Sequence, residues 1–240
     1  MLRSLAAAWN AIDAWALPPR CLACNAPSCS ETRLCRPCAA LLRPSPSAPL
    51  PALRAVDAQV VAAFAYDAES AALLTRYKFH ADLAAGRALA ALCLPTLRNA
   101  ARPQALVPVP LHRRRLRERG HDQALGLARD WGRALALPVL VDALRRERDT
   151  RPQTELDAAE RRRNLDGAFR MAKACPPHVA LVDDVLTTGS TAAAAVQALR
   201  AGGATRVDVW AVARAPVACD QAARATWSSS TPPNTAAPTR

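Results

Sequence analysis

Two adjacent carboxylates, Asp183 and Asp184, stand between an apolar run and a loop rich in hydroxyl groups. The apolar run, residues 179–182, predicts a buried parallel strand, and the alanine-rich stretch after residue 190 predicts a helix. The loop between them contains Thr187, Thr188, Gly189, Ser190 and Thr191. Hydroxyls and backbone N–H groups at a helix N-terminus bind phosphate. The two acids are suited to the hydroxyls of a sugar or to a metal ion.

Neither of the two commonest phosphate-binding glycine motifs, G-x-G-x-x-G and G-x-x-x-x-G-K, is present around this loop. Dinucleotide-binding and P-loop proteins are therefore disfavoured. The structural alternative is an ordinary strand–turn–helix in which Ser and Thr only cap the helix. Adjacent acids at the end of a strand are costly to place without a partner, and this cost favours a binding site.

A second set of chemically capable residues lies near the N-terminus. Two C-x-x-C pairs, Cys21 with Cys24 and Cys35 with Cys38, are spaced as in four-cysteine metal sites. The segment has almost no core-forming residues, so a metal is needed to fold it. A closed shell of four thiolates predicts structural zinc, with redox pairs or disulfides as the alternatives.

The chain is strongly basic, with 32 Lys and Arg against 20 Asp and Glu and a formal net charge of +12. Such an excess favours polyanionic ligands. Arginines cluster between Arg113 and Arg119, and there they predict a site for pyrophosphate or a nucleic-acid backbone. The alternative is a solvated basic surface. The polar segment 148–169, which includes Gln153, predicts a flap that closes over a substrate, or else an exposed helical hairpin.

Strands that alternate with helices position these groups. The pattern predicts strands at 60–66, 105–109, 139–141, 178–182 and 207–213, and helices at 69–77, 83–97, 123–135 and 190–200. This order predicts an α/β fold, with a mostly parallel sheet flanked by helices and ligand loops at the carboxyl ends of the strands.

The predicted organisation has five parts. These are a short amphipathic helix at 1–20, a four-cysteine zinc-binding module at 21–43, a Pro-rich linker at 44–54, the α/β domain at 55–215 and a disordered tail at 216–240. Residues 1–19 have export as their alternative interpretation. No apolar run reaches the roughly 18 residues of a membrane span, and the cysteine spacing favours a reducing, cytoplasmic location.

In combination these motifs resemble the ComF family (ComFC/GntX) of phosphoribosyltransferase-fold proteins. The matching stretches are the two C-x-x-C pairs, Tyr77-Lys78-Phe79, Val107–Pro110 with Arg113 to Gln123, Arg148 to Phe169, and Val179 to Arg214. The resemblance covers roughly residues 15–215, and the joint order of the motifs is more specific than any one of them. Two departures are His121-Asp122 before Gln123, where the family commonly has an aromatic residue and Asn, and the end of the chain from Cys219.

The resemblance implies a type I phosphoribosyltransferase fold behind a zinc module. It implies that the two acids bracket the ribose, or its Mg²⁺, of phosphoribosyl pyrophosphate (PRPP) as catalytic residues, while loop 187–191 binds the 5-phosphate. Arg113, Arg119 and Lys78 then face the pyrophosphate, and Gln153 belongs to the flap. Some members of the family are linked to natural competence, the uptake and processing of single-stranded DNA.

Three functions are compatible with these features. The first is an enzyme that transfers a phosphoribosyl group from PRPP, with Mg²⁺ at the pyrophosphate. The second is a non-catalytic protein that senses a nucleotide or binds single-stranded DNA and DNA-uptake proteins. The third is a zinc scaffold for protein partners. The sequence predicts the donor of the first reaction, but neither its acceptor nor the oligomeric state.

Overall fold

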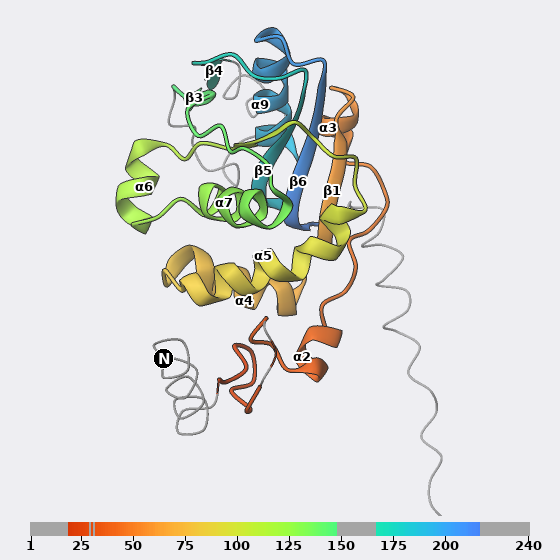
Figure 1. Cartoon of the computed structure of the whole chain (residues 1–240), viewed down its shortest axis with the longest axis vertical. Helices are drawn as coiled ribbons and strands as arrows, with labels where there is room; N and C mark the ends of the chain where they lie inside the picture. The colour runs from red at the N-terminus through yellow and green to blue at the C-terminus, as the bar shows by residue number, and fades with distance from the viewer. Residues whose placement is uncertain (1–18, 29, 31, 148–166, 217–240) are drawn as a thin grey trace, which may run out of the picture.

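Four parallel strands form the central sheet, in the order β1-β6-β5-β2 (Figure 1). The computed structural model describes residues 19–28, 30, 32–147 and 167–216. The strands are β1 Gln59–Ala65, β2 Ala105–Pro108, β5 His178–Leu186 and β6 Arg206–Arg214. Apolar residues on both faces of these strands are buried, as the sheet of a helix-covered α/β protein requires. The predicted α/β fold class is confirmed.

Helices cover both faces of this sheet. Helices α4 (Ala68–Phe79), α5 (Leu83–Arg98) and α7 (Gln123–Leu135) pack against the face that includes Ala180 and Val182. The opposite face, with Val179 and Leu181, packs against α9 (Ser190–Ala201) and α3 (Pro51–Arg54). A small antiparallel pair, β3 (Leu144–Arg146) and β4 (Phe169–Met171), lies beside α9. Alternate residues of β5 thus belong to two hydrophobic clusters, one on each face of the sheet.

Two predictions about local structure are wrong. Residues 139–141 do not form a strand, because Val139 makes only an isolated bridge to Leu106 before the chain turns at Asp142. Residues 44–54 are not only a spacer, because Pro51–Arg54 form helix α3 and Leu50 and Leu53 are fully buried. Proline suits the first position of a helix, and the two leucines, three residues apart, bury one apolar edge of that turn.

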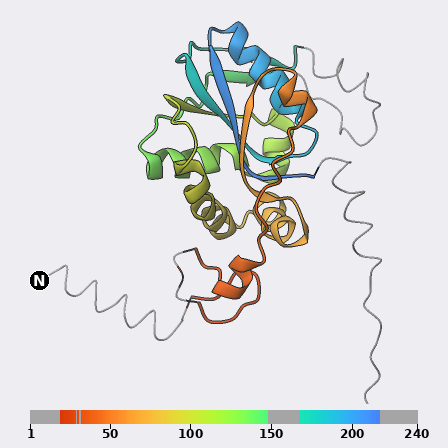
Figure 2. The same cartoon turned by 90° about the vertical axis from the view of Figure 1, so that its right-hand side faces the viewer.

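The N-terminal cysteine segment, which includes α2 (Arg36–Ala40), lies on the α4 side of the molecule, away from α9 (Figures 1 and 2). Residues 1–18, flap residue Gln153 and the tail beyond Pro216 lie outside the described residues, so the predictions made for them stay predictions. In the part of the chain that is described, no helix has both the length and the apolar character needed to cross a membrane.

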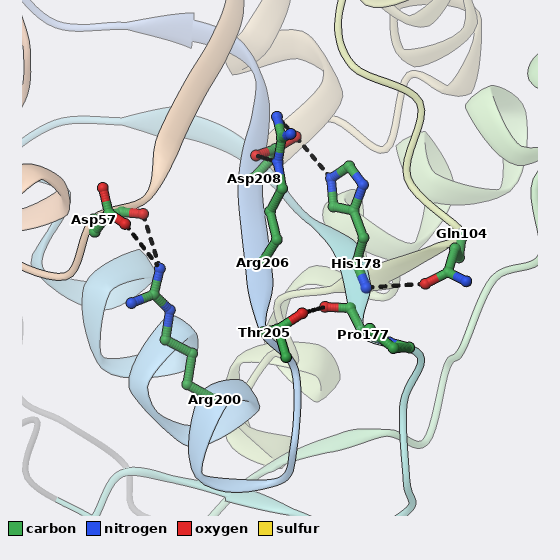
Figure 3. Close-up of polar contacts among 8 residues, drawn as sticks. All are labelled: Asp57, Gln104, Pro177, His178, Arg200, Thr205, Arg206 and Asp208. Carbon is green, nitrogen blue, oxygen red and sulfur yellow. Dashed lines mark hydrogen bonds and ion pairs between the residues drawn. The ribbon is translucent and has the colours of Figure 1, made fainter.

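The amino ends of the strands are joined by a polar network at the sheet edge opposite the predicted site (Figure 3). Asp208 on β6 is almost fully buried, and its carboxylate contacts His178 Nε2 at 2.9 Å and Arg206 Nε at 3.1 Å. Further hydrogen bonds link Gln104 to His178, Thr205 to Pro177 and Arg200 to Asp57. A buried carboxylate needs such partners, and here they fix the relative positions of the strands.

Candidate functional site

The acid pair lies at the carboxyl end of β5, in the centre of the sheet. The structure extends this strand beyond the predicted end at Val182, through both acids to Leu186. The backbone N–H of Asp184 donates to Asp183 Oδ1 at 2.8 Å, which orients the first carboxylate. The second carboxylate is held from another element, since Lys78 Nζ at the end of α4 lies 2.9 Å from Asp184 Oδ2. The described partner of Lys78 is thus an acid, and its place on the pyrophosphate side stays a prediction.

The pKa of Asp183 is unusual for an aspartate. Burial, together with the negative charge of Asp184, raises the pKa of Asp183 from an ordinary 3.8 to about 7. Lys78 and Arg146 act in the opposite direction and offset only part of this effect. Two carboxylates that share a partly buried position are favourable hydrogen-bond acceptors for hydroxyl groups of a ligand.

The hydroxyl-rich loop has the geometry of an anion-binding turn. Gly189 adopts the left-handed conformation with φ of 77° and is the N-cap of α9. Thr188 Oγ1 and Ser190 Oγ share a hydrogen bond of 2.9 Å, which keeps both side chains on the turn. Helix α3 packs closely against this turn: a Cβ atom placed on Gly189 would lie only 3.1 Å from Leu53 Cγ. The loop that leads into α9 is therefore supported by buried leucines, and the N–H groups at the N-terminus of α9 are available to an anion there.

Acids and loop line one pocket of about 360 Å³, together with three arginines, one tyrosine and one glutamine. Arg115 and Arg119 come from helix α6 (Arg113–Arg119), one turn apart, and Arg146 comes from β3. Arg119 donates to Gln123 Oε1 at 3.2 Å and its guanidinium lies 5.3 Å from the ring centre of Phe79. The predicted Arg119, Lys78 and loop residues are thus brought together; Arg113 begins α6, and its side chain is not described.

Sequence reasoning did not identify Arg146 and Tyr66, which also line this pocket. Tyr66 directly follows β1, so its place at the carboxyl end of a strand was a usable signal. Arg146 gave no such signal, because it lies on a three-residue strand that pairs with β4 across a long segment of the chain.

The residues that depart from the family pattern keep a structural role. Asp122 is the N-cap of α7 and accepts a hydrogen bond from Leu125 N at 2.9 Å, as Asn does equally well at this position. Burial raises the pKa of its carboxyl group. The ring of His121 lies 5.2 Å from that of Tyr77, whose hydroxyl donates to the Gln123 carbonyl at 3.0 Å.

The four predicted cysteine ligands are close together. The sulfur atoms of Cys21, Cys24, Cys35 and Cys38 all lie within 4.8 Å of one another. Burial alone would raise the pKa of Cys21, but backbone N–H groups, including that of Cys35 at 3.4 Å, outweigh it and lower the pKa to about 6. A thiolate stabilised in this way is a metal ligand, so the cluster can hold a metal ion such as zinc.

The cysteine segment is attached to the helix that carries Lys78. Arg76 Nη1 donates to the Leu22 carbonyl, and Arg76 Nη2 lies 2.6 Å from Asp82 Oδ2. Leu22, Leu34 and Leu42 belong to the same hydrophobic cluster as residues of α4 and α5. The metal site and the pocket are therefore connected through one helix.

A parallel, helix-covered sheet with an acid pair and a hydroxyl-rich loop at its carboxyl edge defines a phosphoribosyltransferase-like fold, here preceded by a cysteine cluster. The chain belongs to the ComF family, because it is 40% identical over 153 residues to Competence protein F of Haemophilus influenzae. This match covers 60% of the chain and 67% of that protein. DNA utilization protein YhgH of Escherichia coli (strain K12) is 41% identical over 113 residues, which are 47% of the chain and 50% of that protein. The protein of the same name from Salmonella typhi is 39% identical over the same length. No protein-family model matches the chain.

Proposed function

We propose that this protein binds PRPP, or another ligand that contains ribose 5-phosphate, in a cytoplasmic role linked to the uptake and use of DNA. One observation carries the ligand: Asp183 and Asp184 lie directly before a phosphate-type loop, and both line the same pocket as Arg115 and Arg119. The names of the relatives, Competence protein F and DNA utilization protein, support the cellular role.

Each part of the ligand has a matching group in the pocket. The two carboxylates accept hydrogen bonds from the ribose hydroxyls, and residues 187–191 with the N-terminus of α9 hold the 5-phosphate. Arg115, Arg119 and Arg146 offer planar donors for pyrophosphate oxygens.

Magnesium ions are expected to accompany the pyrophosphate, whose charge they neutralise. Lys78 contacts one oxygen of Asp184 at 2.9 Å, and this positive charge makes the acid pair less suited to bind magnesium directly. Zinc fits the four-cysteine cluster as a structural metal, since the cluster is closed and lies apart from the pocket.

Calorimetric titration with PRPP at fixed Mg²⁺ tests the ligand. The wild-type protein is expected to bind, and Asp183→Asn and Asp184→Asn are each expected to weaken binding by at least about tenfold, the effect of one lost charged hydrogen bond. Asp142→Asn is a matched control, because Asp142 forms an exposed pair with Lys173 away from the pocket. Absence of binding by the wild type would reject the proposal. Pyrophosphate release with candidate acceptors then tests phosphoribosyl transfer.

The raised pKa of Asp183 makes this binding depend on pH. The ribose hydroxyls need an ionised carboxylate as acceptor, so affinity for ribose 5-phosphate is expected to be about tenfold weaker at pH 6 than at pH 8 for a group that titrates near 7. The native carboxyl of Asp183 holds its proton between about pH 4 and 7, where an unfolded Asp has lost it. The free energy of unfolding of the ligand-free protein is therefore expected to fall as the pH rises from about 4 to 7.

Calorimetry from pH 6 to 8 measures this effect. The ligand phosphate also titrates in this range, so Asp183→Asn is the control that isolates the protein's contribution. If wild type and Asp183→Asn show the same pH dependence, Asp183 is not the group responsible.

Single-stranded DNA is the second candidate ligand, and the exposed basic surface of α6 favours it. Arg114 and Arg117 are exposed on this helix, and Phe79 beside Arg119 is 64% exposed. Arginines bind the phosphates and an exposed aromatic ring stacks on bases. Fluorescence anisotropy with a labelled oligonucleotide at increasing salt tests it, since phosphate contacts predict a steep loss of affinity. Salt-independent binding would contradict it.

A further inference from the structure

Lys78 forms a close ion pair with the second acid, Asp184. Its Nζ atom lies 2.9 Å from Asp184 Oδ2, and the two side chains are only 21% and 12% exposed. Pairs on the surface of this protein are far more open, such as Lys173 with Asp142 at 65% and 59%. An enclosed pair holds its geometry much better than a solvated one, so Lys78 is a fixed part of the site.

The backbone around Lys78 is held from three directions. Tyr77 is buried, and its hydroxyl donates to the carbonyl of Gln123. Arg76 joins Asp82 and the Leu22 carbonyl, and the carbonyl of Lys78 itself lies 3.5 Å from Gln123 Nε2. The end of α4 is thus locked between α7 and the cysteine segment, and Lys78 reaches Asp184 from a rigid base.

This arrangement changes what the two acids can bind. Two ionised carboxylates side by side form a strong site for a divalent cation, which seeks two or more anionic oxygens. Lys78 places an ammonium group on Asp184 and offsets the negative charge of that carboxylate. Hydroxyl groups need only acceptor atoms, and the carboxylates keep several free lone pairs for them. An anionic sugar phosphate is also repelled less by the partly neutralised pair.

We infer that Lys78 is a positioning and specificity residue that converts the Asp183–Asp184 pair from a divalent-metal site into a site for the ribose diol. This inference rests on the proposed ribose 5-phosphate ligand. Lys78 acts as an internal counter-ion, so the acids bind the sugar without a metal ion of their own. Any Mg²⁺ that accompanies PRPP is then held by the pyrophosphate on the arginine side.

Calorimetry on the full chain with three ligand solutions tests the inference: MgCl₂ alone, ribose 5-phosphate alone, and ribose 5-phosphate with MgCl₂. The proteins are wild type, Lys78→Met, Lys78→Arg and the control Lys173→Met, which breaks the exposed Lys–Asp pair. Methionine keeps the length of the side chain without its charge, and arginine keeps the charge. Circular dichroism checks that each variant is folded.

Wild type is expected to bind ribose 5-phosphate without metal and to show no saturable heat with Mg²⁺ alone below millimolar concentrations. Lys78→Met is expected to bind Mg²⁺ at least about tenfold more tightly than wild type and to lose about thirtyfold in affinity for ribose 5-phosphate, with partial recovery when Mg²⁺ is added. Lys78→Arg and Lys173→Met are expected to behave like wild type toward Mg²⁺. If Lys78→Met unfolds, Lys78→Gln provides the same comparison.

Equal Mg²⁺ affinity in wild type and the neutral variants would overturn the inference, and so would tight Mg²⁺ binding by wild type. The metal-only titration does not depend on the sugar ligand. If wild type fails to bind ribose 5-phosphate while only the neutral variants gain Mg²⁺ affinity, the proposed function fails and the counter-ion role of Lys78 stands.

Discussion

Disrupting the predicted metal site of the four-cysteine cluster is expected to lower the free energy of unfolding by more than about 4 kcal/mol, as loss of a structural metal does. Leu22, Leu34 and Leu42 of the cysteine segment are buried in the same hydrophobic cluster as helices of the α/β body. Loss of one ligand is expected to release the backbone that carries these leucines, so their burial would be lost as well.

Cys24→Ser tests this most cleanly, because Cys24 is exposed and its replacement removes a ligand with little loss of packing. Urea unfolding followed by circular dichroism measures the stability, and metal analysis measures the zinc content, expected to be one per chain in wild type. Cys175→Ser is the control, since this partly buried thiol lies outside the cluster. Unchanged stability and zinc content in Cys24→Ser would show that the cluster is not a structural metal site.

The sequence was sufficient to predict those features that depend on local pattern. The apolar runs of β1, β2, β5 and β6 predicted strands within a few residues of the observed ends, because strands covered on both faces are continuously hydrophobic. Parallel strands bring their carboxyl ends to one edge. The acids after one strand and the arginines after another were therefore expected to meet, and Arg115 and Arg119 do share a pocket with them.

Features that depend on distant partners could not be predicted. The prolines of residues 44–51 predict a linker, whereas helix α3 forms there because Leu53 packs beneath Gly189. Arg146 reaches the pocket only because β3 pairs with β4. The contact between Lys78 and Asp184 also joins distant parts of the chain, and no pattern in the sequence predicts it. In each case the position of a residue depends on a contact with a residue that is distant in the sequence.

Gly189→Val is expected to abolish binding of ribose 5-phosphate, with a loss of affinity above about 100-fold, and to lower the free energy of unfolding by about 3 kcal/mol. Two separate effects contribute. A β-branched residue is strained at φ of 77°, a conformation that glycine adopts freely. The added Cβ would also lie 3.1 Å from Leu53 Cγ and 3.5 Å from Leu50 Cδ1, in a fully buried contact.

Because α3 supports the loop from below, the new side chain cannot move into it without displacing either α3 or the loop itself. Displacement of the loop is expected to move the N–H groups of α9 away from the phosphate, and this weakens binding. Gly203→Val is the matched control: Gly203 has a φ of 103° with no neighbour within 4 Å of an added Cβ, and it lies at the opposite edge of the sheet. Its valine variant should lose stability through strain and keep wild-type affinity in calorimetry. Adding Leu53→Ala to Gly189→Val should restore part of the binding by removing the contact while the strain remains. Wild-type affinity in Gly189→Val would mean that the phosphate is held elsewhere in the pocket.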